Sequence, residues 1–351
     1  MVPPIAGSKI LCCFLIPDKK PGFLKNQNAN DYCKRILLVL IIILNSELNT
    51  PVMKILITGA NGLLGQHLVK QLFDETTHDI IATGKAEPRF IIQDSRIHYQ
   101  SLDITDGMAV NALLDNLQPD TIIHCAALTQ ADECELNPIK AWQVNVTATR
   151  FIIDAAKKIN AFLVFISTDF VFDGANGPYK EEDTVNPVSY YGSTKVAAEK
   201  AVAESGLAYA IVRTCLLYGN ILAGTRSNII SWVKENIEQG KNIKVVSDQW
   251  RTPTYIEDLT KGIMLIIDKK VEGLFHISGN DFLSPYDMAM ATADYINLDK
   301  SLIEKVDAAI FTQPAKRPAK TGFIIDKAKK NLGYDPLSFT EGLKRMLAPI
   351  Q

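Results

Sequence analysis

The stretch KILITGANGLLGQHLVKQL, Lys54 to Leu72, does most to limit what this chain can fold into. A short apolar run precedes Gly59, Gly62 and Gly65, and an amphipathic helical pattern follows over 62–73. The first glycine permits a tight turn, the second lets the backbone approach a pyrophosphate, and the third lets the helix lie close to the strand. The amides and dipole of the helix N-terminus then face the anion. A glycine triplet alone is a weak signal, so its context has to support it.

A regular alternation of strand and helix patterns supplies that context. Strands are predicted at 54–58, 79–83, 97–103, 120–127, 161–168 and 208–214, with helices at 62–73, 107–117, 138–159 and 189–205. Strands of about five residues between helices of ten or more indicate a parallel sheet covered on both faces. Right-handed crossovers make it a doubly wound Rossmann sheet, so we expect an α/β dinucleotide-binding domain over 53–216.

The rhythm changes after Leu216. Helices are expected at 226–239, 255–268, 285–296 and 339–348, and short strands at 243–247, 273–278 and 301–306. This mixture predicts a smaller substrate-binding domain over 217–351, packed against the end of the sheet. Some of its segments are expected to return to the Rossmann domain.

Residues 1–52 form an atypical N-terminal extension without a sustained period. Its nine apolar residues, Ile36 to Leu44, are fewer than the roughly 20 that a bilayer-spanning helix needs. They could form a signal-peptide core after Lys34 and Arg35, but no small-x-small cleavage site follows. Translation that starts at Met53 is favoured over a targeting segment or a structural extension. No membrane association is expected for 53–351.

Composition excludes several classes of function. The chain is 47% hydrophobic and 22% charged with a formal net charge of −2, and no stripe of Lys or Arg suggests nucleic-acid binding. The six cysteines form no CxxC pair and do not combine with histidines at zinc-ligand spacing, so no metal site is expected. This cysteine usage suits a reducing, cytoplasmic location.

A proton-transfer pair is suggested by YGSTK, which places Tyr191 and Lys195 four residues apart on one helix face. A nearby ammonium favours the phenolate, so Lys195 is expected to lower the pKa of Tyr191, which can then protonate a ketone oxygen. Thr168 ends a predicted strand at the carboxyl edge of the sheet, where its hydroxyl could hydrogen-bond the substrate carbonyl. The YxxxK spacing alone is common by chance and usually marks a helix surface.

The end of the second predicted strand bears on the cofactor. An acidic residue there would bind the ribose 2′-hydroxyl of NAD. Instead the chain has Thr83, Gly84, Lys85 and, a little later, Arg89. With no carboxylate to repel a 2′-phosphate and Lys85 able to neutralise it, NADPH is favoured and NADH stays open. Lys85 could also be merely solvated in a loop.

Together these motifs resemble the extended short-chain dehydrogenase/reductase family, and within it the dTDP-4-dehydrorhamnose reductases. The resemblance runs from Met53 to the C-terminus, and its most specific motifs are STDFVFDG and DQWRTPTYIEDL. Further matching motifs are TGANGLLGQ, LDITD, HCAALTQADECE, VNV and KRPAKTGFIID. Phe170 departs from the tyrosine that these reductases often have, and the loose C-terminal motif puts Arg317 in doubt as a substrate contact.

The resemblance implies roles for individual residues. Thr168, Tyr191 and Lys195 would be catalytic, and Trp250 and Arg251 would lie near the nucleotide-sugar. The cofactor would contact Gly59, Asn61, Gly62, Leu63, Leu64, Gly65, Asp103, Ile104, Ala126, Ala127 and Asn145. Arg251 suits a pyrophosphate through its bidentate fork, although Trp250 could instead pack in the core. Asp132 and Glu133 could bind sugar hydroxyls or cap a helix.

The implied reaction is NADPH-dependent reduction of the C4 ketone of a dTDP-6-deoxy-4-keto sugar, with Tyr191 as proton donor. Three alternatives stay open: another sugar-nucleotide reductase, an epimerase, and a non-catalytic regulatory subunit resembling the beta subunit of methionine adenosyltransferase. The absence of an acidic residue after the second strand speaks against an epimerase. The expected partner is a nucleotide-sugar, and the resemblance is compatible with a homodimer.

Overall fold

The computed structural model describes residues 51–90 and 94–348. The predictions for the N-terminal extension, including its apolar run at 36–44, therefore concern a segment that lies outside the described residues apart from its last two positions. Within the described ranges, no helix is long and apolar enough to cross a membrane.

A seven-stranded parallel sheet forms the centre of the fold, with the strand order β10-β6-β5-β4-β1-β2-β3. Its strands are β1 (Lys54–Thr58), β2 (Asp79–Gly84), β3 (Ile97–Ser101), β4 (Thr121–His124), β5 (Phe162–Thr168), β6 (Tyr209–Thr214) and β10 (Gly273–His276). The chain runs outward in opposite directions from β1 and β4, which makes the gap between their carboxyl ends the switch point of a Rossmann sheet. The predicted α/β fold class is confirmed.

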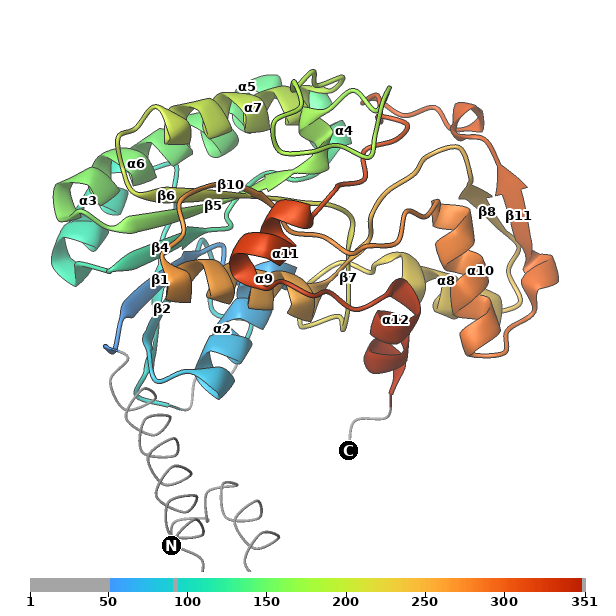
Figure 1. Ribbon diagram of the computed structural model, residues 1–351, viewed down its shortest axis with the longest axis horizontal. Coiled ribbons are helices and arrows are strands. Elements are labelled where there is room, and N and C mark those ends of the chain that lie inside the picture. Colours follow the sequence, from blue (N-terminus) through green and yellow to red (C-terminus); the bar gives the residue numbers. More distant parts are fainter. Residues whose placement is uncertain (1–50, 91–93, 349–351) are drawn as a thin grey trace, which may run out of the picture. The chain divides into compact units, whose positions relative to one another are not determined.

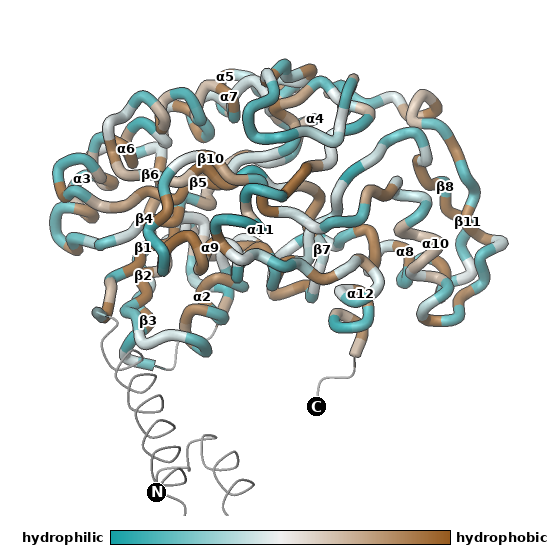
Figure 2. The backbone as a smooth tube through the Cα atoms, in the orientation of Figure 1, coloured by the Kyte–Doolittle hydropathy of each residue, from teal (hydrophilic) through white to brown (hydrophobic). Residues whose placement is uncertain are grey.

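Helices cover both faces of this sheet (Figure 1). On one face lie α2 (Leu63–Glu75), α9 (Ile256–Lys269) and α11 (Asp326–Leu332), and on the other α3 (Gly107–Leu117), α6 (Ala148–Ile159) and α7 (Tyr190–Ala203). Successive strand residues point to opposite faces, so Ile55 and Ile57 pack in one cluster and Leu56 in the other. Figure 2 shows hydrophobic residues concentrated along the central strands.

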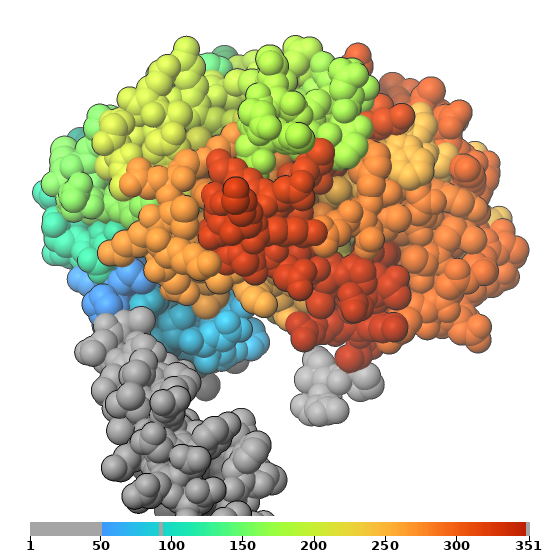
Figure 3. All heavy atoms as spheres, viewed as in Figure 1, coloured from blue at the N-terminus to red at the C-terminus, as the bar shows by residue number. Residues whose placement is uncertain are grey.

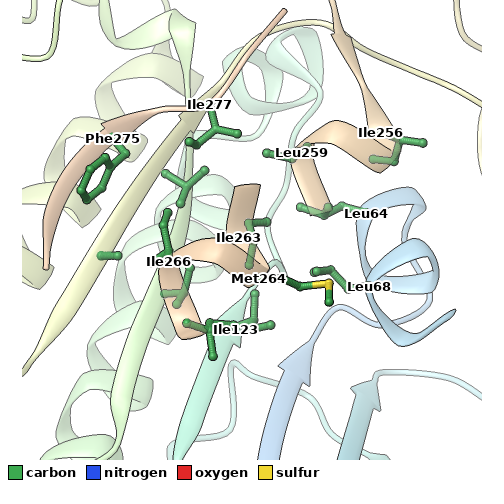
Figure 4. Close-up of a cluster of buried hydrophobic side chains, with 14 of the residues drawn as sticks. Leu64, Leu68, Ile123, Ile256, Leu259, Ile263, Met264, Ile266, Phe275 and Ile277 are labelled. Atoms are coloured by element: carbon green, nitrogen blue, oxygen red, sulfur yellow. The ribbon is translucent and has the colours of Figure 1, made fainter. Parts of the chain in front are cut away.

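The core beneath α2 joins segments that are far apart in the sequence. Leu64 and Leu68 of α2 lie beside Leu259, Ile263 and Met264 of α9, nearly two hundred residues later (Figure 4). Burying a side chain of this size stabilises the fold by roughly 1.5–3 kcal/mol. The helix that begins within the glycine motif, α2, is therefore packed against the C-terminal half of the chain.

A smaller region contains α8 (Ile229–Glu238), β8 (Ile243–Val246), α10 (Pro285–Tyr295) and β11 (Ile303–Val306) around a core of its own. A neighbouring cluster packs α12 (Phe339–Leu347) against the short paired strands β7 (Leu217–Tyr218) and β9 (Thr254–Tyr255). Figure 3 shows the C-terminal part of the chain, in red, on the surface beside the segments drawn in orange.

The strand predicted at 273–278 is β10, which pairs with β6 in the main sheet, so it is a segment after Leu216 that returns to the Rossmann domain. Other features differ from the predicted elements. The predicted helix at 138–159 is divided into α5 (Pro138–Trp142), a π-helical turn (Gln143–Thr147) and α6. The sequence pattern missed α4 (Ala131–Leu136) and α11, since helices of six and seven residues are too short for a clear period.

Candidate active site

A cavity of about 940 Å³ opens at the carboxyl edge of the sheet, beside the switch point. It is lined by most of the predicted site residues, namely Gly59, Asn61, Gly62, Leu63, Leu64, Gly65, Lys85, Asp103, Ile104, Ala126, Ala127, Thr168, Tyr191, Lys195 and Arg251. Three predicted residues, Asp132, Asn145 and Trp250, do not line it. The structure thus gathers nearly all of the expected cofactor contacts, and it divides the expected substrate contacts.

The glycine motif forms the floor of one half of the cavity. Gly59 has a φ of +70°, and a Cβ there would lie 2.8 Å from the Cα of Ala126. A Cβ on Gly65 would lie 2.4 Å from the carbonyl oxygen of Gly59. The first turn of α2 contains no acidic residue and its N-cap Gly62 brings no capping side chain, so its amides are left for an anion. These features fit the pyrophosphate of a dinucleotide.

The loop after β2 is held by Asn61. Its side-chain amide donates to the carbonyl of Glu87 at 3.0 Å and accepts from the amide of Arg89 at 2.9 Å. Nearby, the Nζ of Lys85 lies 2.7 Å from Oδ2 of Asp103, and this contact lowers the pKa of Asp103 to about 2. The expectation that no carboxylate lies near Lys85 is therefore wrong: β3 ends beside β2, and the residues just after β3 bring Asp103 to the lysine.

Thr168, Tyr191 and Lys195 lie together on the cavity wall. Thr168 ends β5, while Tyr191 and Lys195 lie on successive turns of α7 and are buried. Ser189 caps this helix by accepting from the amide of Gly192 at 3.2 Å. The ring of Phe170 meets that of Tyr191 edge-on, with centroids 5.7 Å apart, so the departure noted in the sequence keeps an aromatic ring against Tyr191.

The electrostatics of this set differ from the expectation. Burial raises the pKa of Tyr191 above its ordinary value, opposed by a hydrogen bond with Thr168, and Lys195 does not contribute. Instead, the Nζ of Lys195 donates to the carbonyl of Ile166 at 2.7 Å and lies 4.0 Å from the ring centroid of Phe165. Burial lowers the pKa of Lys195 to about 8. The predicted lowering of the Tyr191 pKa by Lys195 is corrected, because the ammonium is directed toward β5.

Asn145 supports the cavity from behind. Its side chain accepts from the amide of Leu128 at 2.7 Å and donates to the carbonyl of the same residue at 3.0 Å. It also donates to Oγ1 of Thr194 on α7 at 3.0 Å. Asn145 therefore fixes the loop after β4, which carries Ala126 and Ala127, and its predicted place on the cavity wall is corrected.

Arg251 lines the cavity, but most of its fork is already used. Its Nε lies 3.2 Å from Oδ2 of the buried Asp169. Its two terminal nitrogens donate to three backbone carbonyls, those of Trp250, Pro318 and Ala319. Trp250 is half-buried and packs against the ring of Phe282, with centroids 5.7 Å apart, outside the hydrophobic clusters of the core.

Two further cations lie at this end of the cavity, and each pairs with an acidic residue of α4. Arg317 makes two contacts of 2.6 Å with the carboxylate of Asp132. Lys140 lies 2.7 Å from Oε1 of Glu133. Arg317, which the loose motif had put in doubt, lines the cavity, as does Lys140, which the sequence reasoning missed. The position of Lys140 in the segment that follows β4 could have indicated a place in the site, because segments that follow parallel strands begin at the carboxyl edge of the sheet.

Among residues 51–90 and 94–348, no three His, Cys, Asp or Glu side chains are grouped so as to hold a metal ion. A Rossmann sheet with a glycine cradle at its switch point, and a buried Thr/Tyr/Lys set beside it, defines an extended short-chain dehydrogenase/reductase. Within that class the chain belongs to the RmlD substrate binding domain family, whose model matches residues 53–351.

Known relatives include proteins of different function. The chain is 34% identical to methionine adenosyltransferase 2 subunit beta of Mus musculus over 318 residues, covering 88% of this chain and 91% of that protein. It is 30% identical to dTDP-4-dehydrorhamnose reductase of Aggregatibacter actinomycetemcomitans, covering 84% and 98%. The crystal structure of dTDP-4-dehydrorhamnose reductase from Bacillus anthracis in complex with NADP is 30% identical with a TM-score of 0.74, covering 84% and 99%. The family thus includes sugar-nucleotide reductases and a subunit of a different enzyme.

Proposed function

We propose that the chain is an NADPH-dependent reductase that converts the C4 ketone of a dTDP-6-deoxy-4-keto sugar to the alcohol, forming dTDP-L-rhamnose from dTDP-4-dehydrorhamnose. One observation carries the proposal: Thr168, Tyr191 and Lys195 lie on the wall of the same cavity as the glycine cradle. The named reductases among the relatives support this choice of substrate.

The chain's own groups fit this chemistry. The amides at the start of α2 would hold the cofactor pyrophosphate, and NADPH, when bound, supplies the hydride that reduces C4. The hydroxyl of Tyr191 gives its proton to the ketone oxygen, and Thr168 hydrogen-bonds that oxygen. A proton donor has to be protonated at neutral pH, and burial favours this form by raising the pKa of Tyr191. Lys195, whose ammonium also donates to the carbonyl of Ile166, holds the cofactor ribose.

Cofactor preference rests on Lys85, which would turn from Asp103 to a 2′-phosphate. Because the side chain of Lys85 is 78% exposed, this movement displaces nothing buried. Binding of a 2′-phosphate brings a second anion beside Asp103, so the preference for NADPH over NADH is expected to be modest, and NADH stays a usable cofactor.

The other end of the cavity suits an anionic nucleotide. Arg317 and Lys140 lie on its wall, and the guanidinium of Arg317 has the planar fork that binds phosphate through two bonds. In the structure this fork is held by Asp132, so a substrate diphosphate would have to compete with that carboxylate. Arg251 would contribute positive charge near the diphosphate, but its terminal nitrogens are already bonded to backbone carbonyls and would not bind the phosphate as a pair.

A second candidate function is a regulatory subunit. It is favoured by the 34% identity to methionine adenosyltransferase 2 subunit beta over most of both chains. A complete Thr168, Tyr191 and Lys195 set does not by itself exclude such a role, and turnover has to be measured.

The deciding experiment compares Tyr191→Phe with Tyr190→Phe. Tyr190 is adjacent but does not line the cavity, so it provides a matched control. Tyr191→Phe is expected to lower NADPH consumption with a 4-keto sugar nucleotide by about 10²–10⁴-fold, since the proton donor is lost. NADPH binding should stay within about twofold, because the ring that shapes the site is retained. Tyr190→Phe should behave as wild type.

A panel of 4-keto sugar nucleotides, assayed with NADPH and with NADH, then identifies the sugar and the cofactor. If the wild-type chain turns over none of them but binds the catalytic subunit of methionine adenosyltransferase, the reductase proposal fails and the regulatory function gains.

A further inference from the structure

A buried carboxylate lies directly behind the Tyr191/Lys195 pair. Glu199 follows Lys195 by one turn of α7, on the same helix face, and its side chain is only 9% exposed. The hydroxyl of Ser167 donates to its Oε1 at 2.5 Å. From β6, Arg213 donates to both carboxylate oxygens, at 2.9 Å through Nε and 2.7 Å through a terminal nitrogen. Glu199 therefore ties α7 to β5 and β6 at the level of the site.

The other groups that face Lys195 carry little negative charge. From β4 and the loop after it come His124, whose pKa burial lowers to about 3, and Cys125, whose pKa burial raises to about 12, so both are neutral near pH 7. Phe165 and the carbonyl of Ile166 face it from β5. Tyr191, on its own helix, is protonated. Among the described residues, Glu199 is the carboxylate that opposes the loss of charge by the buried lysine.

We propose that Glu199 is a positioning residue for the Tyr191/Lys195 pair: fixed by Ser167 and Arg213, its carboxylate keeps Lys195 charged and directed toward β5. This inference rests on the proposed reductase function. Its consequence is a working range that extends to alkaline pH, since the ammonium would otherwise lose its proton in the buried site.

The test is Glu199→Gln in the full chain, with two readouts between pH 6 and pH 10, so that a midpoint below the wild-type pKa of Lys195, about 8, stays within the range. One is kcat/KM for reduction, and the other is the NADPH dissociation constant, measured from NADPH fluorescence at those pH values that lie above the range in which the 2′-phosphate titrates. Both should weaken as the pH rises through the pKa of Lys195, and the midpoint should move down by about one pH unit in the variant. Glu199→Asp keeps the charge and should restore most of the wild-type profile.

Two variants control for stability. Glu204→Gln removes an exposed carboxylate at the end of α7, where Glu204 pairs with Lys200 at 3.8 Å, and should leave both profiles unchanged. Because Glu199→Gln leaves Arg213 buried without its partner, the single variant is expected to be less stable than the wild type. The double variant Glu199→Met/Arg213→Met removes both charges together and should show a smaller shift in the same direction, because the positive charge of Arg213 is lost with the carboxylate.

The outcomes separate the two proposals. A folded Glu199→Gln or double variant with wild-type pH profiles overturns the role of Glu199. If no substrate is turned over but the NADPH affinity shifts as expected, the reductase function fails while Glu199 keeps its role in charging Lys195. If neither readout shifts, the inference fails regardless of turnover.

Discussion

The half of the cavity proposed to bind the cofactor, called the cofactor half, and the half proposed to bind the substrate, called the substrate half, are built in different ways. The cofactor half is made from backbone: Gly59 to Gly65 supply a turn and a helix N-terminus within one short segment. The substrate half is made from side-chain pairs between distant segments, Asp169 with Arg251 and Asp132 with Arg317. The cofactor half requires glycines, which have no Cβ, and the substrate half requires pairs of opposite charges.

Because of this difference, different substitutions are expected to harm the two halves. An added methyl group harms the cofactor half, because the backbone there has no room for it. Loss of one charge harms the substrate half in proportion to the burial of the remaining partner. Asp169 and Arg251 are almost fully buried, whereas the side chain of Asp132 is 38% exposed, so the two pairs should respond differently.

The largest effect is expected for Arg251→Met. The variant leaves Asp169 buried with its main positive partner removed, and should lower the free energy of unfolding by about 3–5 kcal/mol. Urea unfolding measures this loss. Lys244→Met, which breaks an exposed pair with Glu304, should cost less than about 1 kcal/mol. A near-normal stability of Arg251→Met with a strongly raised substrate KM would mean that Arg251 acts on the substrate and not on the fold.

The next effect tests the backbone half. Gly65→Ala places a Cβ 2.4 Å from the carbonyl oxygen of Gly59, and the overlap should cost about 1–3 kcal/mol. If α2 shifts to relieve it, NADPH affinity should fall by roughly 10–100-fold while the substrate half keeps its geometry. Fluorescence titration with NADPH measures the loss. Gly240→Ala is a control for the introduced methyl, because a Cβ there meets nothing within 4 Å, although its positive φ adds a small strain. Unchanged NADPH affinity in Gly65→Ala would contradict the assignment of the cradle.

Two buried histidines, His124 and His276, are expected to make the stability of the fold depend on pH. His124, behind the cofactor half, has both ring nitrogens bonded, to Oγ1 of Thr58 at 2.7 Å and to Oγ1 of Thr149 at 3.1 Å. The ring nitrogens of His276 on β10 have only weak backbone contacts, with Tyr179 and Ile324, and no well-formed hydrogen bond among the described residues; the ring stacks on Phe323, with centroids 4.0 Å apart. Burial lowers the pKa of each to about 3.

These pKa values predict a loss of stability in acid. Each folded-state pKa lies below the unfolded value of about 6.5, so the contribution is fully present above pH 6.5 and is lost as the pH falls toward 3. The slope is at most about 1.4 kcal/mol per pH unit for each histidine. His276→Phe should reduce the slope with little cost at pH 7, whereas His124→Phe should cost about 1–3 kcal/mol at pH 7 by leaving Thr58 and Thr149 without their partner. Unfolding curves from pH 4.5 to 8 measure both. Equal costs at pH 7 would contradict the contrast.

The smallest effect concerns Lys85. Lys85→Ala should weaken NADPH binding by about fivefold and leave NADH unchanged, as expected for an exposed charge pair. Asp103→Asn should shift the preference the other way, because it frees Lys85 and removes the nearby anion. The ratio of the two dissociation constants is the measurement, and an equal loss for both cofactors in Lys85→Ala would exclude a role in recognising the 2′-phosphate.

The sequence alone was enough to predict the fold class, and it named the glycine cradle and the Thr168/Tyr191/Lys195 set that the structure brings to one cavity. These features depend on local period, on glycine spacing and on the rule that parallel strands end at one edge, all of which are visible within short windows. The rule that parallel strands end at one edge predicted that Thr168 lies at the carboxyl edge of the sheet. The sequence around Lys85 did not indicate that the loop after β3 would bring Asp103 to it.

Tertiary structure alone decided which side chains are free to act. Three outcomes depend on contacts between distant segments: Arg251 has its terminal nitrogens bonded to backbone carbonyls, β10 joins the main sheet, and Lys195 faces β5. The sequence reveals the charge of a residue but not its partner, because pairing is fixed by packing across the whole core. For the same reason Glu199, four residues beyond a predicted catalytic lysine, became visible only when β5 and β6 were seen to hold it.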